Sequence, residues 1–157
     1  MPVRRIKAGL FISVSIPIVL LFTSHACMTF RMSHKEIESF FREENVNGSQ
    51  HLIRTGNQPI HYVKAGNPKG ALALFVHGSP GSLSAFIHFL ADSMLNRELL
   101  LITTDRPGFG HSNFGIAEPS LKKQAAALAP ILRAHQSNRP ILLVGHSLGG
   151  PLVARMA

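Results

Sequence analysis

The sequence predicts an α/β fold with a mostly parallel sheet, an N-terminal hairpin at one sheet edge and helices on both faces. Two short strand patterns come first, at residues 51–55 and 60–64, and apolar strands then alternate with helical patterns. The run at residues 71–76 is apolar throughout, which is typical of a strand covered on both faces.

Composition limits the function classes. The chain has 157 residues, enough for one domain with a sizeable core, and a formal net charge of +8. Five of its 16 basic residues lie among the first 35, and the others are scattered without a basic stripe or interleaved aromatic residues. We therefore expect no nucleic-acid partner. The single cysteine, Cys27, excludes an intrachain disulfide and a cysteine-based zinc site.

Residues 1–27 have the pattern of a targeting segment. Three cations precede the apolar run at residues 8–22, and Ser24-His25-Ala26 places small residues three and one before Cys27. The stretch resembles a bacterial lipoprotein signal, in which that cysteine is lipidated, although Ser24 stands where such signals usually carry leucine. A lipoprotein signal, a cleaved signal peptide and an uncleaved membrane anchor all stay open. Each predicts an exported or membrane-attached protein.

Residues 28–50 are expected to be a linker with a short helix. Ser33-His34-Lys35-Glu36 has the S-x-x-E form of a capping box and predicts a helix to about Glu44. Ile37, Phe40 and Phe41 recur at helical spacing, so this helix has one apolar face. We expect that face to pack against the main domain, residues 51–157, rather than to rest on a membrane.

The elements of the main domain follow in order. The hairpin turns across residues 56–59, and a buried strand covers 71–76. The spacing predicts a helix over 83–95 with an apolar stripe formed by Phe86, Phe89, Leu90 and Met94. A buried strand at 99–103 precedes a helix that begins after Ser120. The last strand, 141–144, leads into a helix over 148–156.

The turn between the last strand and the last helix carries Gly145-His146-Ser147-Leu148-Gly149, the G-x-S-x-G spacing of a nucleophile elbow. A serine at such a turn must adopt strained backbone angles. Glycines two before and two after it let the strand and the helix approach without collision. The spacing therefore predicts Ser147 as a catalytic nucleophile.

Three motifs stand at the carboxyl ends of successive predicted strands: HGSPG at 77–81, DRPGFGHS at 105–112 and GHSLGGP at 145–151. Together they resemble the α/β-hydrolase fold superfamily, in its serine esterase, lipase and peptidase branch. The resemblance covers residues 51–157 and corresponds to the N-terminal half of that fold.

The resemblance implies a serine hydrolase that acts on a small-molecule carboxylic ester or amide without metal or cofactor. Ser147 would attack the substrate, and the backbone N–H groups of Leu148 and Ser79 would form the oxyanion hole. Five residues would support the elbow and the neighbouring loop: Gly145, His146, Gly149, His77 and Gly78.

In the family an acid and a histidine follow the serine. Here ten residues follow Ser147, and they include no aspartate, glutamate or histidine. We therefore expect a truncated α/β-hydrolase fold whose strand at 141–144 has an open, self-associating edge. The alternative is an inactive fragment or binding module that keeps only the front half of the fold. A nucleotide-binding protein is disfavoured, because no G-x-G-x-x-G follows the first strand.

Overall fold

The computed structural model describes residues 30–135 and 138–157. The expectations for residues 1–27, including lipidation of Cys27, lie outside the described residues. Among the helices that are described, none is long and apolar enough to cross a membrane.

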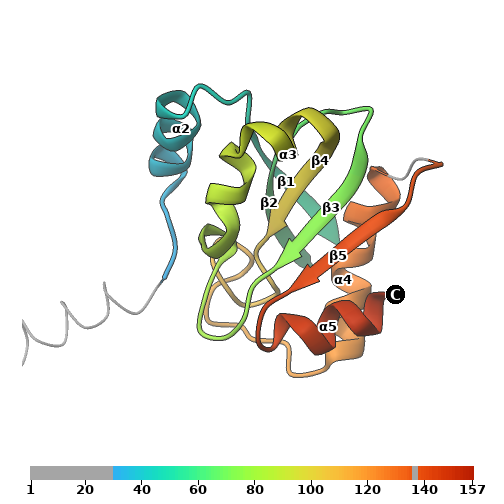
Figure 1. The fold of residues 1–157 in the computed structure, drawn as a ribbon. Helices are drawn as coiled ribbons and strands as arrows, with labels where there is room; N and C mark the ends of the chain where they lie inside the picture. The colour runs from blue at the N-terminus through green and yellow to red at the C-terminus, as the bar shows by residue number, and fades with distance from the viewer. Residues whose placement is uncertain (1–29, 136–137) are drawn as a thin grey trace, which may run out of the picture.

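A five-stranded sheet forms the centre of the domain, with strand order β1-β2-β4-β3-β5 (Figure 1). The pairs β1–β2 and β2–β4 are antiparallel, whereas β4–β3 and β3–β5 are parallel. The predicted α/β fold, a mostly parallel sheet with an N-terminal hairpin at one edge, is confirmed. Its strands are β1 (Ser49–Thr55), β2 (Gln58–Gly66), β3 (Ala71–Val76), β4 (Leu99–Thr104) and β5 (Ile141–Gly145).

The hairpin turn is shorter than predicted. Thr55 pairs with Gln58, so Gly56 and Asn57 alone make the turn. Gly56 has a φ of +59°, a left-handed conformation that glycine adopts without steric cost. The strands can therefore continue into residues that the sequence pattern assigned to the loop.

Helices cover both faces of the sheet, as the apolar strands predict. Alternate residues of β3 divide the core: Leu72, Leu74 and Val76 belong to one apolar cluster, and Ala73 and Phe75 belong to the other. The first cluster is completed by α4 (Leu121–Ala134) and α5 (Gly149–Met156), and the second by α2 (His34–Glu43) and the 3₁₀ helix η1 (Leu83–Ala91).

Helix α2 packs against the sheet domain, as expected. Its capping box is complete, because the Ser33 side chain accepts a hydrogen bond from Glu36 N–H while the Glu36 carboxylate accepts one from Ser33 N–H. These bonds to Ser33 hold the pKa of Glu36 below its usual value. Ile37, Phe40 and Phe41 are buried in the cluster beneath η1.

The single helix predicted over 83–95 is wrong. A 3₁₀ helix ends at Ala91, and Asp92 caps a separate helix, α3 (Ser93–Glu98), by accepting from Met94 and Leu95 N–H. Because a 3₁₀ helix has three residues per turn, the buried face is not the one that an α-helical period selects. Phe89 and Met94 are exposed instead of lying in the core.

Strand β5 lies at the edge of the sheet, next to β3. Ile141 and Leu142 on this strand are 37% and 53% exposed. The self-association expected of such an edge stays a prediction.

Candidate active site at the carboxyl edge of the sheet

Ser147 lies at the turn where β5 ends and α5 begins (Figure 1). Its φ is +52°, a left-handed conformation that costs a non-glycine residue free energy. Local hydrogen bonds hold the turn: Gly149 N–H donates to His146 O at 2.8 Å, and Gly150 N–H donates to Ser147 O at 2.9 Å. The serine is exposed at the carboxyl edge of the sheet.

The two glycines of the motif occupy positions without room for a side chain. A Cβ on Gly145 would lie 2.3 Å from Gly149 O, and one on Gly149 would lie 2.1 Å from Val76 O. Both contacts are with backbone, which cannot rotate away as the end of a side chain can. The close approach of β5, α5 and the end of β3 therefore requires glycine at both positions.

The loop after β3 lies against the same turn. A Cβ on Gly78 would come within 2.9 Å of the Ser147 Cβ and 3.1 Å of the His146 Nδ1. Ser79, the next residue, is exposed. The HGSPG loop and the G-x-S-x-G turn, which are distant in sequence, are thus brought into contact by the pairing of β3 with β5.

His77 is buried and holds this loop. Its Nδ1 donates to Gly78 O at 2.7 Å, and its Nε2 accepts from Arg106 N–H at 3.0 Å. Burial lowers the pKa of His77 to about 4, so the ring is neutral near pH 7. Because both ring nitrogens are engaged, His77 is not available as a general base for Ser147.

Arg106 is fully buried and reinforces the same loop. Its Nη2 donates to Gly78 O at 2.9 Å, and its Nη1 donates to Gln124 Oε1 at 3.1 Å. The guanidinium lies 4.4 Å from the centroid of the Phe109 ring. Sequence reasoning missed Gln124 as its partner, and the one available signal was a polar side chain within the apolar stripe of α4.

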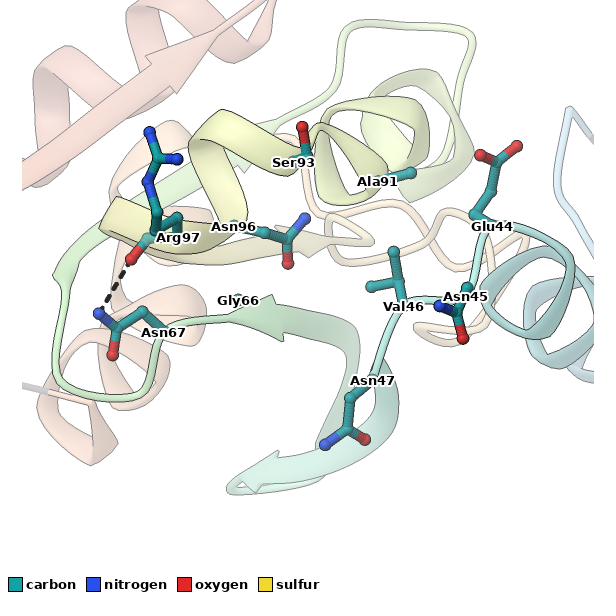
Figure 2. A pocket seen from close by; sticks show the side chains of 10 residues that line it. All are labelled: Glu44, Asn45, Val46, Asn47, Gly66, Asn67, Ala91, Ser93, Asn96 and Arg97. Carbon is teal, nitrogen blue, oxygen red and sulfur yellow. Dashed lines mark hydrogen bonds between the residues drawn. The ribbon is translucent and has the colours of Figure 1, made fainter.

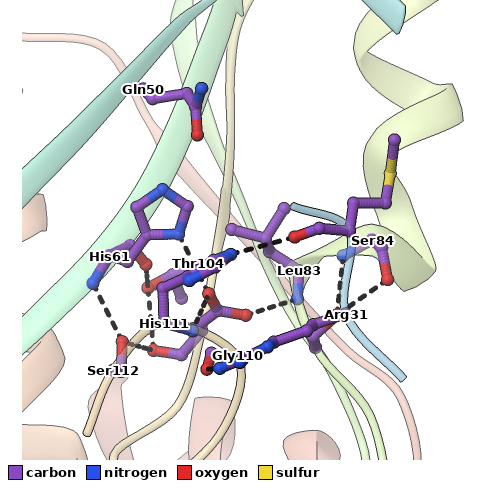
Figure 3. Close-up of polar contacts among 12 residues, drawn as sticks. Arg31, Gln50, His61, Leu83, Ser84, Thr104, Gly110, His111 and Ser112 are labelled. Atoms are coloured by element: carbon purple, nitrogen blue, oxygen red, sulfur yellow. Dashed lines mark hydrogen bonds and ion pairs between the residues drawn. The ribbon is translucent and has the colours of Figure 1, made fainter. Parts of the chain in front are cut away.

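Asp105 is the central hydrogen-bond acceptor of the second motif, DRPGFGHS. It is 0% exposed, and its Oδ1 accepts from Leu83 N–H at 2.8 Å. Its Oδ2 accepts from His111 N–H at 2.9 Å and from His61 Nδ1 at 3.0 Å. These bonds come from β2, the start of η1 and the loop itself, and Figure 3 labels the three donor residues, His61, Leu83 and His111. Asp105 therefore organises the loops rather than facing a substrate.

A cavity of about 660 Å³ lies at the opposite end of the sheet from Ser147. Figure 2 shows it between α3 and the segment that joins α2 to β1, close to Gly66 and the Asn67 side chain. Asn67 N–H donates to Leu99 O at the start of β4, which places this cavity at the amino end of the parallel strands. We therefore do not include it in the candidate site.

Acid is expected to destabilise the fold through His77. Because its pKa is lower in the folded chain than in the unfolded chain, the unfolded chain binds the proton first, and stability falls as pH falls from about 6.5 towards 4. Between pH 7 and pH 5 the free energy of unfolding should drop by about 2 kcal/mol from this group. Urea unfolding of the native chain and of His77→Gln at both pH values measures it. An equal drop in the two proteins would show that the loss does not come from His77, because all the other histidines are common to both.

The chain is thus an α/β protein in which the loops after β3 and β4 lie beside the turn between β5 and α5. All three are at the carboxyl edge of the sheet. A family model described as the alpha/beta hydrolase fold matches residues 74–157. The chain belongs to the alpha/beta hydrolase fold family.

Individual relatives agree with this assignment. A protein of Schizosaccharomyces pombe (strain 972 / ATCC 24843) named "Putative monoglyceride lipase" is 32% identical over 97 residues, which are 54% of this chain and 24% of that protein. Among solved structures, a membrane phospholipase A described as a novel bacterial virulence factor aligns with a TM-score of 0.64 and 23% identity. That alignment covers 98% of this chain and 47% of the other.

A thioesterase domain from the curacin biosynthetic pathway aligns with a TM-score of 0.60 and 23% identity, over 70% of this chain and 39% of that one. At this level of identity the two structural likenesses show the fold alone. This chain spans about a quarter of the length of the yeast relative and less than half of either structure.

Proposed function

We propose that Ser147 is the nucleophile of a serine hydrolase that acts on carboxylic esters or amides. The observation that carries this proposal is the left-handed backbone of an exposed serine at the turn between β5 and α5. A strained non-glycine residue persists only where its surroundings impose that conformation, and such residues gather at functional sites. The name of the yeast relative favours a glycerol ester among the substrates.

In the proposed reaction the Ser147 Oγ bonds to the substrate carbonyl carbon, and a general base takes the hydroxyl proton. The carbonyl oxygen becomes an oxyanion, which the N–H groups of Leu148 and Ser79 would stabilise. Collapse of the intermediate expels the alcohol or amine, which takes up a proton, and water then hydrolyses the acyl-enzyme. By resemblance, the base would be a histidine paired with a carboxylate.

The contacts of the Gly78–Ser79 peptide support the role of the Ser79 amide. Its carbonyl, Gly78 O, accepts from both His77 Nδ1 and Arg106 Nη2. In a trans peptide the N–H points away from the C=O, so anchoring the carbonyl in the interior turns the Ser79 N–H outward. Loss of one oxyanion donor typically costs about 3 kcal/mol of transition-state stabilisation.

Reaction with a fluorophosphonate probe tests the proposal. We expect slow labelling of the purified chain, because within the described residues no histidine is hydrogen-bonded to Ser147. We expect Ser147→Ala to abolish this labelling. Ser79→Ala is the matched control, because it removes a neighbouring hydroxyl but keeps the backbone N–H, and it should be labelled like the native chain.

Absence of labelling in a chain whose circular dichroism shows the native fold would contradict the proposal for this chain. That result would favour the alternative function, a binding module without hydrolase activity. Labelling that survives Ser147→Ala would instead assign the reaction to another residue.

A further inference from the structure

The described residues that precede α2 are bound to the carboxyl-edge loops. We call residues 30–33 the arm. Phe30 O accepts from Ser82 Oγ at 2.5 Å and from Ser84 Oγ at 3.1 Å. Arg31 Nη1 donates to Gly110 O at 2.9 Å, as Figure 3 shows. The arm is thus attached both to the loop after β3 and to the loop after β4.

A further hydrogen bond, through His111, connects the arm to Asp105. His111 Nε2 donates to Met32 O at 2.9 Å, and His111 N–H is held by Asp105. The His34 and His111 rings stack with centroids 4.1 Å apart. The arm is therefore connected through His111 to Asp105 in the core of the fold.

Exposed apolar side chains surround the place where the arm is bound. Phe30 is 54% exposed, and Phe114 and Ile116, in the loop after β4, are 44% and 62% exposed. The Arg31 guanidinium lies 5.1 Å from the centroid of the Phe114 ring. We call Phe30, Phe114 and Ile116 the loop patch. The loop after β4 has two acids: Asp105 is fully buried, and Glu118 is half-buried and lies 3.9 Å from the Lys123 ammonium. Neither is an exposed carboxylate beside the exposed cation Arg31.

The apolar run at residues 8–22 lies close to this patch along the chain. Eight residues from Phe22 to Phe30 span at most about 28 Å when fully extended. A domain of this size has a diameter of about 35 Å. If the run or a lipid on Cys27 enters a bilayer, this reach is too short for the amino end of the sheet to face the bilayer, and the carboxyl edge, where the arm is bound, is the side nearest to the point of attachment.

We propose that the carboxyl-edge loops rest on a lipid bilayer, with the loop patch among the headgroups and Arg31 at the level of the phosphates. Apolar side chains with a neighbouring cation suit this interfacial region. In this orientation Ser147 faces the lipid, and a substrate would reach it from the membrane. The orientation is independent of whether Ser147 is a nucleophile.

Tryptophan fluorescence tests the orientation directly, because the chain contains no tryptophan. Phe114→Trp reports on the loop patch. Met94→Trp is the matched control, since Met94 is 68% exposed on α3, which precedes the start of β4 at the opposite end of the sheet. Each full-length variant is mixed with vesicles of phosphatidylcholine and phosphatidylglycerol that carry brominated acyl chains.

We expect the brominated lipid to quench the Phe114→Trp variant at least threefold more than the Met94→Trp variant, with a blue shift only in the former. Ile116→Asp should reduce vesicle binding several-fold while leaving the circular dichroism unchanged, because this side chain is exposed. Equal quenching at the two positions, or failure to bind vesicles, would overturn the proposal. A concentration-dependent blue shift without lipid would also overturn it and would assign the loop patch to contact with a second copy.

Discussion

Asp105→Asn is expected to lower the free energy of unfolding by about 3 kcal/mol. The carboxylate is fully buried and accepts hydrogen bonds from Leu83 N–H, His111 N–H and His61 Nδ1. The asparagine side chain has one acceptor oxygen where the carboxylate has two. In either orientation, its NH₂ group therefore faces at least one of these N–H donors and cannot accept from it. A buried backbone N–H then loses its partner, which costs far more than an exposed hydrogen bond. Urea unfolding at pH 7, followed by circular dichroism, measures the loss.

Asp92→Asn is the matched control for this prediction. Asp92 accepts from Met94 and Leu95 N–H at the exposed start of α3, where asparagine caps a helix about as well as aspartate. We expect a change within about 0.5 kcal/mol. A similar loss in both variants would show that the three bonds to Asp105 do not carry the stability assigned to them.

Gly149→Ala is expected to destabilise the fold by about 3 kcal/mol, at the upper end of the usual range for overpacking. The new Cβ would lie 2.1 Å from Val76 O, a backbone atom at the carboxyl end of β3. Relief requires α5 to move away from the end of β3, and this movement would displace Ser147. The midpoint of thermal unfolding, followed by circular dichroism, gives the direction and the rough size of the effect.

Gly150→Ala provides the comparison at the neighbouring position of the same helix. Nothing lies within 4 Å of a Cβ placed there. Since alanine is favoured over glycine in helices, this substitution should stabilise the chain by roughly 0.5 to 1 kcal/mol. If both variants lowered stability equally, the loss would reflect a general intolerance of α5 to substitution, and the proposed collision with Val76 O would be wrong.

The candidate site and the proposed membrane contact lie at the same edge of the sheet. The loop after β3, the loop after β4 and the turn after β5 all lie at this carboxyl edge, as in other open α/β sheets. The arm is bound to two of these three loops, so residues 30–33 lie at the same edge of the sheet as Ser147. In the proposed membrane orientation, a substrate would therefore reach Ser147 from the lipid.

Much of the architecture could be predicted from the sequence. The apolar run at 71–76 matches β3 residue for residue, and Ser33 and Ser120 are the helix caps that their patterns predict. These features depend on residues close together in the chain, where periodicity and capping act. The segment at 83–95 was mispredicted because a switch from 3₁₀ to α geometry at Asp92 leaves no distinct period.

The candidate site was only partly predictable. The G-x-S-x-G spacing by itself indicated a sharp turn at Ser147, because the steric demand on the two glycines is local. The motifs did not show that Arg106 and His77 jointly hold Gly78 O, or that His61 reaches Asp105. Arg106 and Gly78 are 28 positions apart in the chain, and His61 and Asp105 are 44 apart. Of these bonds, only the one between His77 and its neighbour Gly78 is local.

The sequence by itself determined the class of fold, most of the helices and strands, and the serine that stands at the turn. Only the tertiary structure decided that Asp105 is a buried hub, that His77 is held as a neutral donor and acceptor, and that the arm is fixed to the carboxyl-edge loops. The physical reason is that local patterns specify the elements. Insertion of β4 between β2 and β3, by contrast, brings His61, Asp105 and Leu83 together across long stretches of chain.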